Sequence, residues 1–312
     1  MAKDKRSYKV RNWAAYNQAL INRGKITLWI DQEAKDKWWA KKRKKNGRPF
    51  IYSDEAILCL LMIKAVYRLA YRPLQGFCQS LFEILHDEQR VPCYTQICRR
   101  ASRLGQQVKK LSRKQPTDLV FDSTGLKVYG EGEWKVRKHG RGKRRTWRKF
   151  HIAMCPDSHE VMLFEVTDKD ESDGRVMPEL LELAPSSVTR VYGDGAYDTQ
   201  TCYRAILGHG AEAVIPPRRN GICRDEIYFK SRTKALKIIA ALGDDSAART
   251  LWKKLCGYHR RSLVEATFSR FKRLLGDRLW STKPGSIRSE IYAKCLALNR
   301  MTNVGMPKGV MV

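Results

Sequence analysis

Apolar residues recur every three or four positions between Ser53 and about Leu111, a spacing that predicts helices. Ser53 can cap the first of them, and a second is expected from Pro73 onward. After a break, Thr95 can cap a short basic helix that ends at Leu104 and carries Arg99, Arg100 and Arg103. This succession has the outline of a helix-turn-helix whose last helix would read a DNA groove, although a plain helical bundle explains the apolar spacing equally well.

From about Asp118 the apolar residues form short runs that are typical of strands. We expect a strand at 119–121 and a hairpin of strands at 150–154 and 161–166. Helices at 177–183 and 201–207 should then alternate with strands at 189–193 and 211–215. A hairpin followed by such alternation predicts a mixed α/β sheet. A basic, partly helical insertion at about 216–257 precedes a long final helix that is expected to begin near Tyr258.

The net charge of the chain narrows the classes of function that it can have. The 312 residues include 61 Lys and Arg against 32 Asp and Glu, a net charge of +29, which predicts a polyanionic partner. The longest apolar run, 56–62, is far shorter than the roughly 20 residues that cross a bilayer, so we expect nucleic acid rather than a membrane. Residues 1–25 lack the apolar core of a signal peptide, which indicates a cytoplasmic, nucleoid-facing protein.

These patterns divide the chain into four parts. Residues 1–48 are expected to form a basic N-terminal arm that is a solvated, flexible segment, binds phosphates directly, or does both, since such arms order on nucleic acid. We expect residues 49–115 to form a helical DNA-binding domain, residues 116–300 an α/β catalytic domain that includes the insertion, and residues 301–312 a C-terminal tail.

Three acidic residues have the placement that metal-dependent phosphodiester chemistry needs, on rigid elements from which carboxylates can converge. Asp122 follows the predicted strand 119–121, Asp194 stands between two glycines at a strand end, and Glu265 lies on the last helix. Each of them could equally be a cap or turn residue, and the glycines could mark only a tight turn.

The last helix adds a second pattern. If it is continuous from Tyr258, then Arg261, Glu265 and Lys272 lie within about 60° of that residue at ~100° per position. The neighbouring arc is apolar, so the helix can pack one side and direct this polar stripe outward. One acid between two cations suits metal and phosphate binding, whereas a surface salt bridge from Arg261 to Glu265 explains only one pair.

The Tyr-xx-Arg-xxx-Glu-xxxxxx-Lys pattern resembles the signature around the catalytic Glu of insertion-sequence transposases of the Asp-Asp-Glu type. Further stretches are similar to the same family, in particular to the IS-five branch of its IS-four-like superfamily: 122–127, 132–134, 138–140, 144–149, 193–198, and in the amino-terminal half 47–49 and 92–95. The resemblance implies a ribonuclease-H-like, mixed-sheet catalytic core preceded by an all-α, helix-turn-helix-like DNA-binding region.

The resemblance also implies a reaction. An enzyme of this family would bind the terminal inverted repeats of its bacterial insertion sequence, cut at the ends, and join the 3′ hydroxyl ends to target DNA, as a homodimer or higher multimer. Asp122, Asp194 and Glu265 would bind two Mg²⁺ ions, for which Mn²⁺ can substitute. Arg261 and Lys272 would hold DNA phosphates, and Tyr258 would contact the same strand.

Other charged residues receive more local interpretations. The basic segment 135–149 is expected either to be a solvated loop or to contact the DNA backbone through Lys138, Arg144, Arg145 and Arg148. Asp198 is expected to cap the helix that follows it, and the acidic cluster at 168–173 to cap the helix at Met177.

Three other functions remain as alternatives. A catalytically silent DNA-binding regulator derived from a transposase would be marked by a broken triad or by loss of Arg261 or Lys272. A ribonuclease-H-like nuclease would cut without joining strands. An RNA-binding structural protein would account for the charge, but not for the glycines around Asp194.

Overall fold

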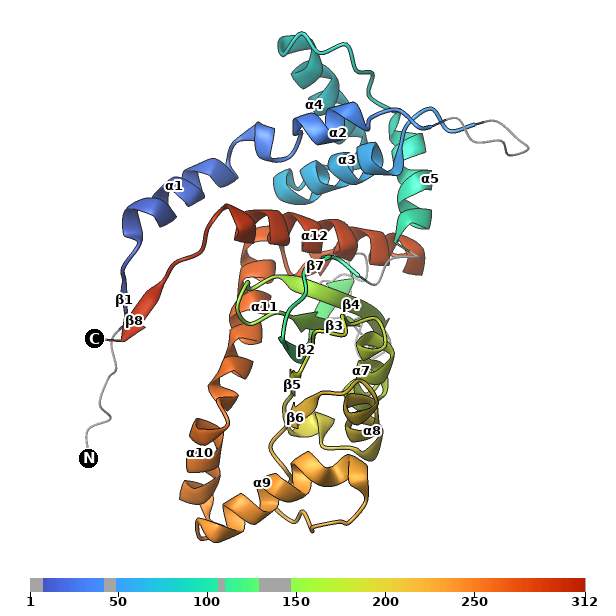
Figure 1. The fold of residues 1–312 in the computed structure, drawn as a ribbon. Coiled ribbons are helices and arrows are strands. Elements are labelled where there is room, and N and C mark those ends of the chain that lie inside the picture. Colours follow the sequence, from blue (N-terminus) through green and yellow to red (C-terminus); the bar gives the residue numbers. More distant parts are fainter. Residues whose placement is uncertain (1–7, 42–48, 106–109, 129–146, 312) are drawn as a thin grey trace, which may run out of the picture. The chain divides into compact units, whose positions relative to one another are not determined.

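The computed structural model describes residues 8–41, 49–105, 110–128 and 147–311 (Figure 1). The chain divides into two compact units, Met1–Ala101 with Leu296–Val312, and Ser102–Cys295. No helix in the described ranges is long and apolar enough to cross a membrane.

The first unit is mainly helical. Its elements are β1 (Tyr8–Val10), α1 (Trp13–Arg23), α2 (Gln32–Asp36), α3 (Asp54–Tyr67), α4 (Tyr71–Ile84), most of α5 (Tyr94–Leu104), the end of α12 (Pro284–Val304) and β8 (Gly309–Met311). Strands β1 and β8 pair antiparallel, with Tyr8 opposite Met311, so both ends of the described chain belong to this unit. Helices α1 and α2 lie within the stretch expected to be an arm.

The expected cap at Ser53 is confirmed, since its Oγ accepts a hydrogen bond from the Ala56 N–H at 2.9 Å. Helix α3 is buried along most of its length because the apolar residues surround it rather than forming one stripe. The cap expected at Thr95 is wrong. Helix α5 begins one residue earlier, at Tyr94, whose N–H donates to the Gln75 side chain at 2.8 Å.

The second unit contains a six-stranded mixed sheet, as the sequence predicted. Its strands are β2 (Asp118–Val128), β3 (Trp147–Met154), β4 (Val161–Asp168), β5 (Arg190–Tyr192), β6 (Glu212–Val214) and β7 (Arg278–Leu279). The order is β4-β3-β2-β5-β6, and β7 pairs with the far end of β2. Strand β3 runs antiparallel to its two neighbours, β2 and β4, whereas β5, β6 and β7 run parallel to β2.

Helices cover both faces of this sheet (Figure 1). Helices α7 (Asp173–Leu181) and α8 (Gln200–Gly208) pack on one face, where Leu119 and Phe121 of β2 join their apolar core. Helix α11 (Ser262–Leu275) lies on the other face. Because side chains alternate along a strand, each residue of β2 is directed to one helix layer or the other.

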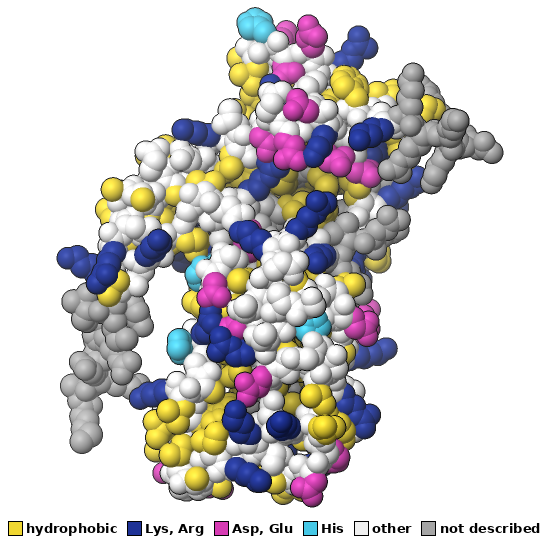
Figure 2. Space-filling model, viewed as in Figure 1, with side chains coloured by type: hydrophobic (Ala, Val, Ile, Leu, Met, Phe, Trp, Pro, Cys, Tyr) yellow, Lys and Arg dark blue, Asp and Glu magenta, His cyan; other side chains and the backbone are white. Residues whose placement is uncertain are grey.

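The insertion forms a helix pair, α9 (Lys230–Ala241) and α10 (Ser246–Leu255), with a small core of its own around Trp252. Exposed apolar side chains gather over α10, among them Leu251 and Leu255 (Figure 2). Helix α10 is followed by Gly257, whose φ of +68° favours glycine.

Two expected boundaries are wrong in ways that affect the site. Asp122 does not end its strand but lies inside it, because the polar residues after it continue the ladder with β3 from Ser123 opposite His151 to Lys127 opposite Trp147. The final helix does not begin at Tyr258. A 3-10 turn, η4 (Tyr258–Arg261), precedes α11 and changes the direction of the first two residues of the expected stripe.

A buried ion-pair cluster ties η4 to the sheet. Asp118, which is fully buried, accepts two hydrogen bonds from Arg190 at 3.0 and 2.9 Å and pairs with Arg260 of η4. Arg260 also pairs with Asp157 in the β3–β4 turn. This cluster therefore fixes where α11 begins relative to β2.

We predict that Asp118→Ala lowers the free energy of unfolding by about 2–4 kcal/mol, because it leaves two guanidinium groups without their buried partner. Asp157→Ala, which removes the exposed partner of Arg260, should cost less than about 1 kcal/mol. Urea denaturation measures both. Equal losses would show that the buried carboxylate is not what anchors η4.

Candidate active site

The three predicted catalytic carboxylates come from three separate elements of the second unit. Asp122 lies within β2 with 15% of its side chain exposed, and its Oδ1 accepts the Ser123 N–H at 2.8 Å. Asp194 follows β5 directly and caps the 3-10 turn η2 (Gly195–Tyr197) by accepting the Ala196 N–H at 2.8 Å. Glu265 lies in the first turn of α11 and is 59% exposed.

All three carboxylates pair with one guanidinium, that of Arg261. Its Nη2 lies 3.0 Å from Oδ2 of Asp122 and 3.8 Å from Oδ2 of Asp194, and its Nη1 pairs with Oε1 of Glu265. The sequence predicted both that these acids would converge and that Arg261 would lie beside Glu265. It did not predict that the arginine would lie among them.

The electrostatics of the site follow from this arrangement. Burial raises the pKa of the Asp122 carboxyl to about 6, and the neighbouring charge of Asp194 adds to the effect, whereas Arg261 lowers it. Burial likewise raises the pKa of Tyr258 to about 12, and the charges of Asp122 and Asp194 contribute to that shift. A buried, ionised Asp122 is therefore favoured by any cation that lies beside it.

The donor set fits a hard divalent cation in its chemistry, since carboxylate oxygens are the ligands that Mg²⁺ prefers. Among the residues that the structure describes, however, no three Asp, Glu, His or Cys side chains stand close enough together to share one ion. The carboxylates are instead spaced around the Arg261 guanidinium. The carboxylates fit a divalent ion in their chemistry, and the Arg261 guanidinium would have to leave its position among them before they could bind one.

Contacts at three positions along β2 hold η4 and α11 against one face of this strand. Arg260 pairs with Asp118, Arg261 pairs with Asp122, and Lys272 Nζ donates to Oγ1 of Thr124 at 2.6 Å. These partners are even-numbered residues of β2 and share a face because the strand period is two. The polar stripe was expected to point outward, and this is wrong for Arg261 and Lys272, which face the sheet because Asp122 and Thr124 of β2 bind them.

The opposite face of β2 carries a polar cluster that the sequence analysis did not identify. Asp173, at the start of α7, pairs with Lys149 at 3.0 Å and with Nδ1 of the buried His151 at 3.2 Å. Burial alone would raise the pKa of Asp173, but hydrogen bonds from His151, Ser123 and Lys149 hold it well below its ordinary range. Asp173 thus binds Ser123, the residue next to Asp122. Its place in a polar, acidic loop concealed this role.

Asp198 does not cap α8, contrary to expectation. Thr199 takes that position and accepts the Cys202 N–H at 3.4 Å. The buried Asp198 carboxylate pairs with Arg232 of α9 at 2.8 Å and accepts the Tyr203 hydroxyl at 3.1 Å. The Asp198 carboxylate therefore connects α9 of the insertion to α8 through charge-assisted hydrogen bonds.

The predicted DNA contacts differ in their surroundings. In α5, Arg99 and Arg103 are exposed, whereas Arg100 pairs with Asp54, donates to the Tyr52 carbonyl at 2.9 Å and lies over the Phe50 ring. Arg148 pairs with Asp168, its neighbour across the β3–β4 ladder. The other predicted contacts lie outside the described residues: Lys138, Arg144 and Arg145.

Comparison with known proteins places the chain in a family. It matches the transposase DDE domain over residues 113–300, and a second transposase DDE domain over residues 21–131. The chain therefore belongs to the Asp-Asp-Glu transposases of the IS-four-like superfamily. Among solved structures it is similar to a piggyBac transposase in a synaptic complex with hairpin DNA, at 10% identity and a TM-score of 0.38, over 92% of this chain and 79% of that one. At that score the likeness supports no inference about function.

The glycine before Asp194, Gly193, is required by the packing of a neighbouring aromatic ring. A Cβ on Gly193 would lie 2.8 Å from Cδ2 of the buried Tyr197 ring, whereas a Cβ on Gly195 would meet no atom within 4 Å. Gly193 therefore lets the Tyr197 ring pack beneath the turn that carries Asp194.

We predict that Gly193→Ala displaces Tyr197 and Asp194 and destabilises the protein by about 1–3 kcal/mol, the usual range for overpacking. Gly195→Ala is the matched control and should change stability by less than about 0.5 kcal/mol. Both are measured by urea denaturation. Equal effects of the two substitutions would contradict this account of Gly193.

Proposed function

We propose that the chain is a metal-dependent DNA transposase that binds the terminal inverted repeats of a bacterial insertion sequence, cuts at its ends and joins the 3′ ends to target DNA. The observation that carries the proposal is the convergence of Asp122, Asp194 and Glu265, from three elements, on a single cation. A net charge of +29 supports DNA as the partner.

We further propose that the sheet is a ribonuclease-H-like core. Three antiparallel strands followed by two parallel ones support this assignment, since they leave Asp122 on the central strand and Asp194 at the end of its parallel neighbour β5. Neighbouring strands lie about 5 Å apart, so the two carboxylates are held close without any flexible connection between them.

In the proposed reaction Asp122, Asp194 and Glu265 hold the metal ions. Two Mg²⁺ ions, or Mn²⁺ in their place, would supply Lewis-acid activation of the attacking oxygen and would stabilise charge on the leaving oxygen. Arg261, relieved of its carboxylate partners, would pair with a DNA phosphate, and Lys272 would hold a second one. Tyr258 lies near the same carboxylates and would contact that strand.

The proposal assigns recognition of the element ends to the helical region around α5. Its support is the exposure of Arg99 and Arg103 on one short helix, from which both could reach a groove. Arg100 is better suited to hold α5 against the start of α3. Two ends must be joined in one event, so we propose that at least two copies act together on DNA.

We predict that Asp122→Asn, Asp194→Asn and Glu265→Gln each reduce Mg²⁺-dependent cleavage by roughly a thousandfold or more, because metal ligands act as a unit. The substrates are duplexes made from the DNA that flanks the gene on each side. Binding of the same duplexes should remain. Asp225→Asn, a change of the same charge at an exposed site, is the control. A wild-type chain that binds these duplexes but never cuts them would favour the silent regulator.

A second prediction concerns sequence reading. Replacing Arg99 and Arg103 with Ala should weaken binding to end duplexes more than to random duplexes, since each base contact contributes about 1–3 kcal/mol of discrimination. Competition binding with both DNAs measures the ratio. A parallel loss on both would assign these arginines to the DNA backbone and leave sequence recognition to another element.

A further inference from the structure

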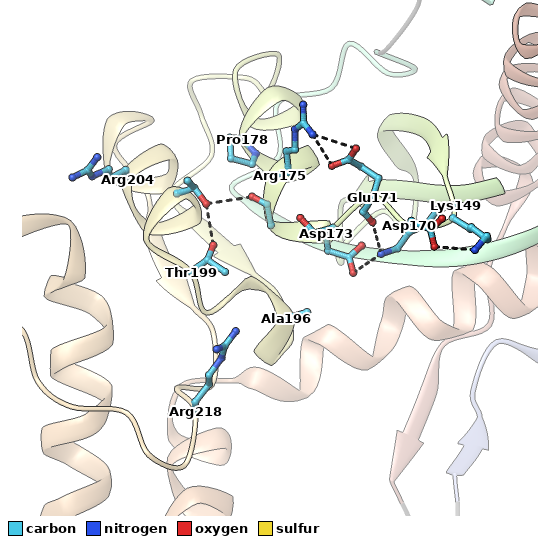
Figure 3. A pocket seen from close by; sticks show the side chains of 14 residues that line it. Lys149, Asp170, Glu171, Asp173, Arg175, Pro178, Ala196, Thr199, Arg204 and Arg218 are labelled. Atoms are coloured by element: carbon cyan, nitrogen blue, oxygen red, sulfur yellow. Dashed lines mark hydrogen bonds and ion pairs between the residues drawn. The ribbon is translucent and has the colours of Figure 1, made fainter. Parts of the chain in front are cut away.

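A pocket of about 800 Å³ opens beside the carboxylate centre, within the second unit (Figure 3). It lies between the N-terminal ends of α7 and α8, and Ala196 of η2 forms part of its wall. Its volume is within the roughly 300–1,000 Å³ that suffices for a ligand of nucleotide size. None of the roles proposed above uses it.

The wall of this pocket carries an excess of positive charge. It contains five Lys and Arg side chains and three carboxylates. Each carboxylate is paired within the wall, at 2.9, 3.4 and 3.0 Å respectively: Asp170 with Lys169, Glu171 with Arg175, and Asp173 with Lys149. Arg204 and Arg218 are left over, and in the described part of the chain neither pairs with a carboxylate through its side chain.

The two arginines come from different elements, Arg218 from the loop after β6 and Arg204 from helix α8. The Arg218 N–H donates to the buried Asp198 carboxylate at 2.9 Å, and the side chain extends toward Ala196 and Thr199 (Figure 3). The Arg204 guanidinium lies 4.6 Å from the centre of the Tyr228 ring. Guanidinium groups match phosphate oxygens in geometry and charge.

The N-terminal end of α7 forms part of the same wall, and its backbone N–H groups carry partial positive charge. Its N-cap residue, Ser172, makes no side-chain cap hydrogen bond, so its hydroxyl does not occupy the first-turn N–H groups. An anion is favoured at such a helix end. This feature reinforces the two arginines.

The pocket and helix α11 flank the carboxylates from opposite faces of β2. On the α11 side, Arg261 and Lys272 contact even-numbered residues of the strand. On the pocket side, Asp173 binds Ser123, and the Ala196 N–H binds Asp194. Cations therefore lie on both faces of β2, so that phosphates of two DNA molecules could be held at one centre.

We propose that this pocket holds backbone phosphates of the second DNA, the one to which the cut end is joined, through Arg204 and Arg218. The inference rests on the proposed function, because the DNA assigned to this pocket is the second substrate of that reaction. The DNA end that is cut lies on the α11 side.

The test uses the full chain with Arg204→Gln and Arg218→Gln combined. Lys237→Gln with Lys254→Gln, exposed cations of α9 and α10, is the charge-matched control. Two products are measured with Mg²⁺: the cut end, from duplexes that carry the flanking DNA, and the joined strand, from a labelled random duplex. We expect joining to fall about tenfold or more, as for the loss of one or two charge-assisted hydrogen bonds, while cutting stays near the wild-type rate.

A binding measurement keeps the proposal separate from the activity on which it rests. The slope of log affinity against log salt for a random duplex should fall by about one to two, since each phosphate contact contributes roughly 0.9. An unchanged slope overturns the pocket assignment, whether or not the wild-type chain cuts DNA. Failure of the wild-type chain to cut DNA would refute only the proposed function. Equal losses of cutting and joining would place the cut end in the pocket, and would therefore also overturn the assignment of the pocket to the second DNA.

Discussion

Repulsion among three carboxylates is the constraint on which the candidate site depends. Asp122, Asp194 and Glu265 carry like charges into one small region, one of them largely buried, and such a group is stable only around a cation. In this chain that cation is the Arg261 guanidinium. The same residue is therefore the partner of the carboxylates here and, in the proposed reaction, the cation that becomes available to a phosphate.

The alternation of side chains along β2 organises everything around that centre. Even-numbered residues meet η4 and α11 through Asp118, Asp122 and Thr124, whereas Ser123 meets Asp173 on the other face. A one-residue shift of register would exchange the two sets. The buried pairing of Asp118 with Arg190 and Arg260 therefore also sets which side of the sheet the Asp122 carboxylate faces.

The sequence predicted most of the fold and the three acids, because apolar runs and short motifs are local signals. It could not predict that Asp122 lies inside a strand, since residues 123–127 are extended only through their ladder with β3. Nor could it single out Asp173 from its acidic neighbours. The position of Arg261 depends on the 3-10 turn η4, which interrupts a pattern that otherwise suits one continuous helix.

The pairing of β1 with β8 has a consequence for the order in which the protein can be made. The helical unit needs residues 296–311, yet these are synthesised only after the whole of the other unit. At about 5–20 residues per second, the intervening stretch takes roughly 10–40 s to emerge. During that time the sheet that carries the carboxylates can already fold, while Arg23 and Leu28 still lack their partners near the C-terminus, Gly305 and Arg300.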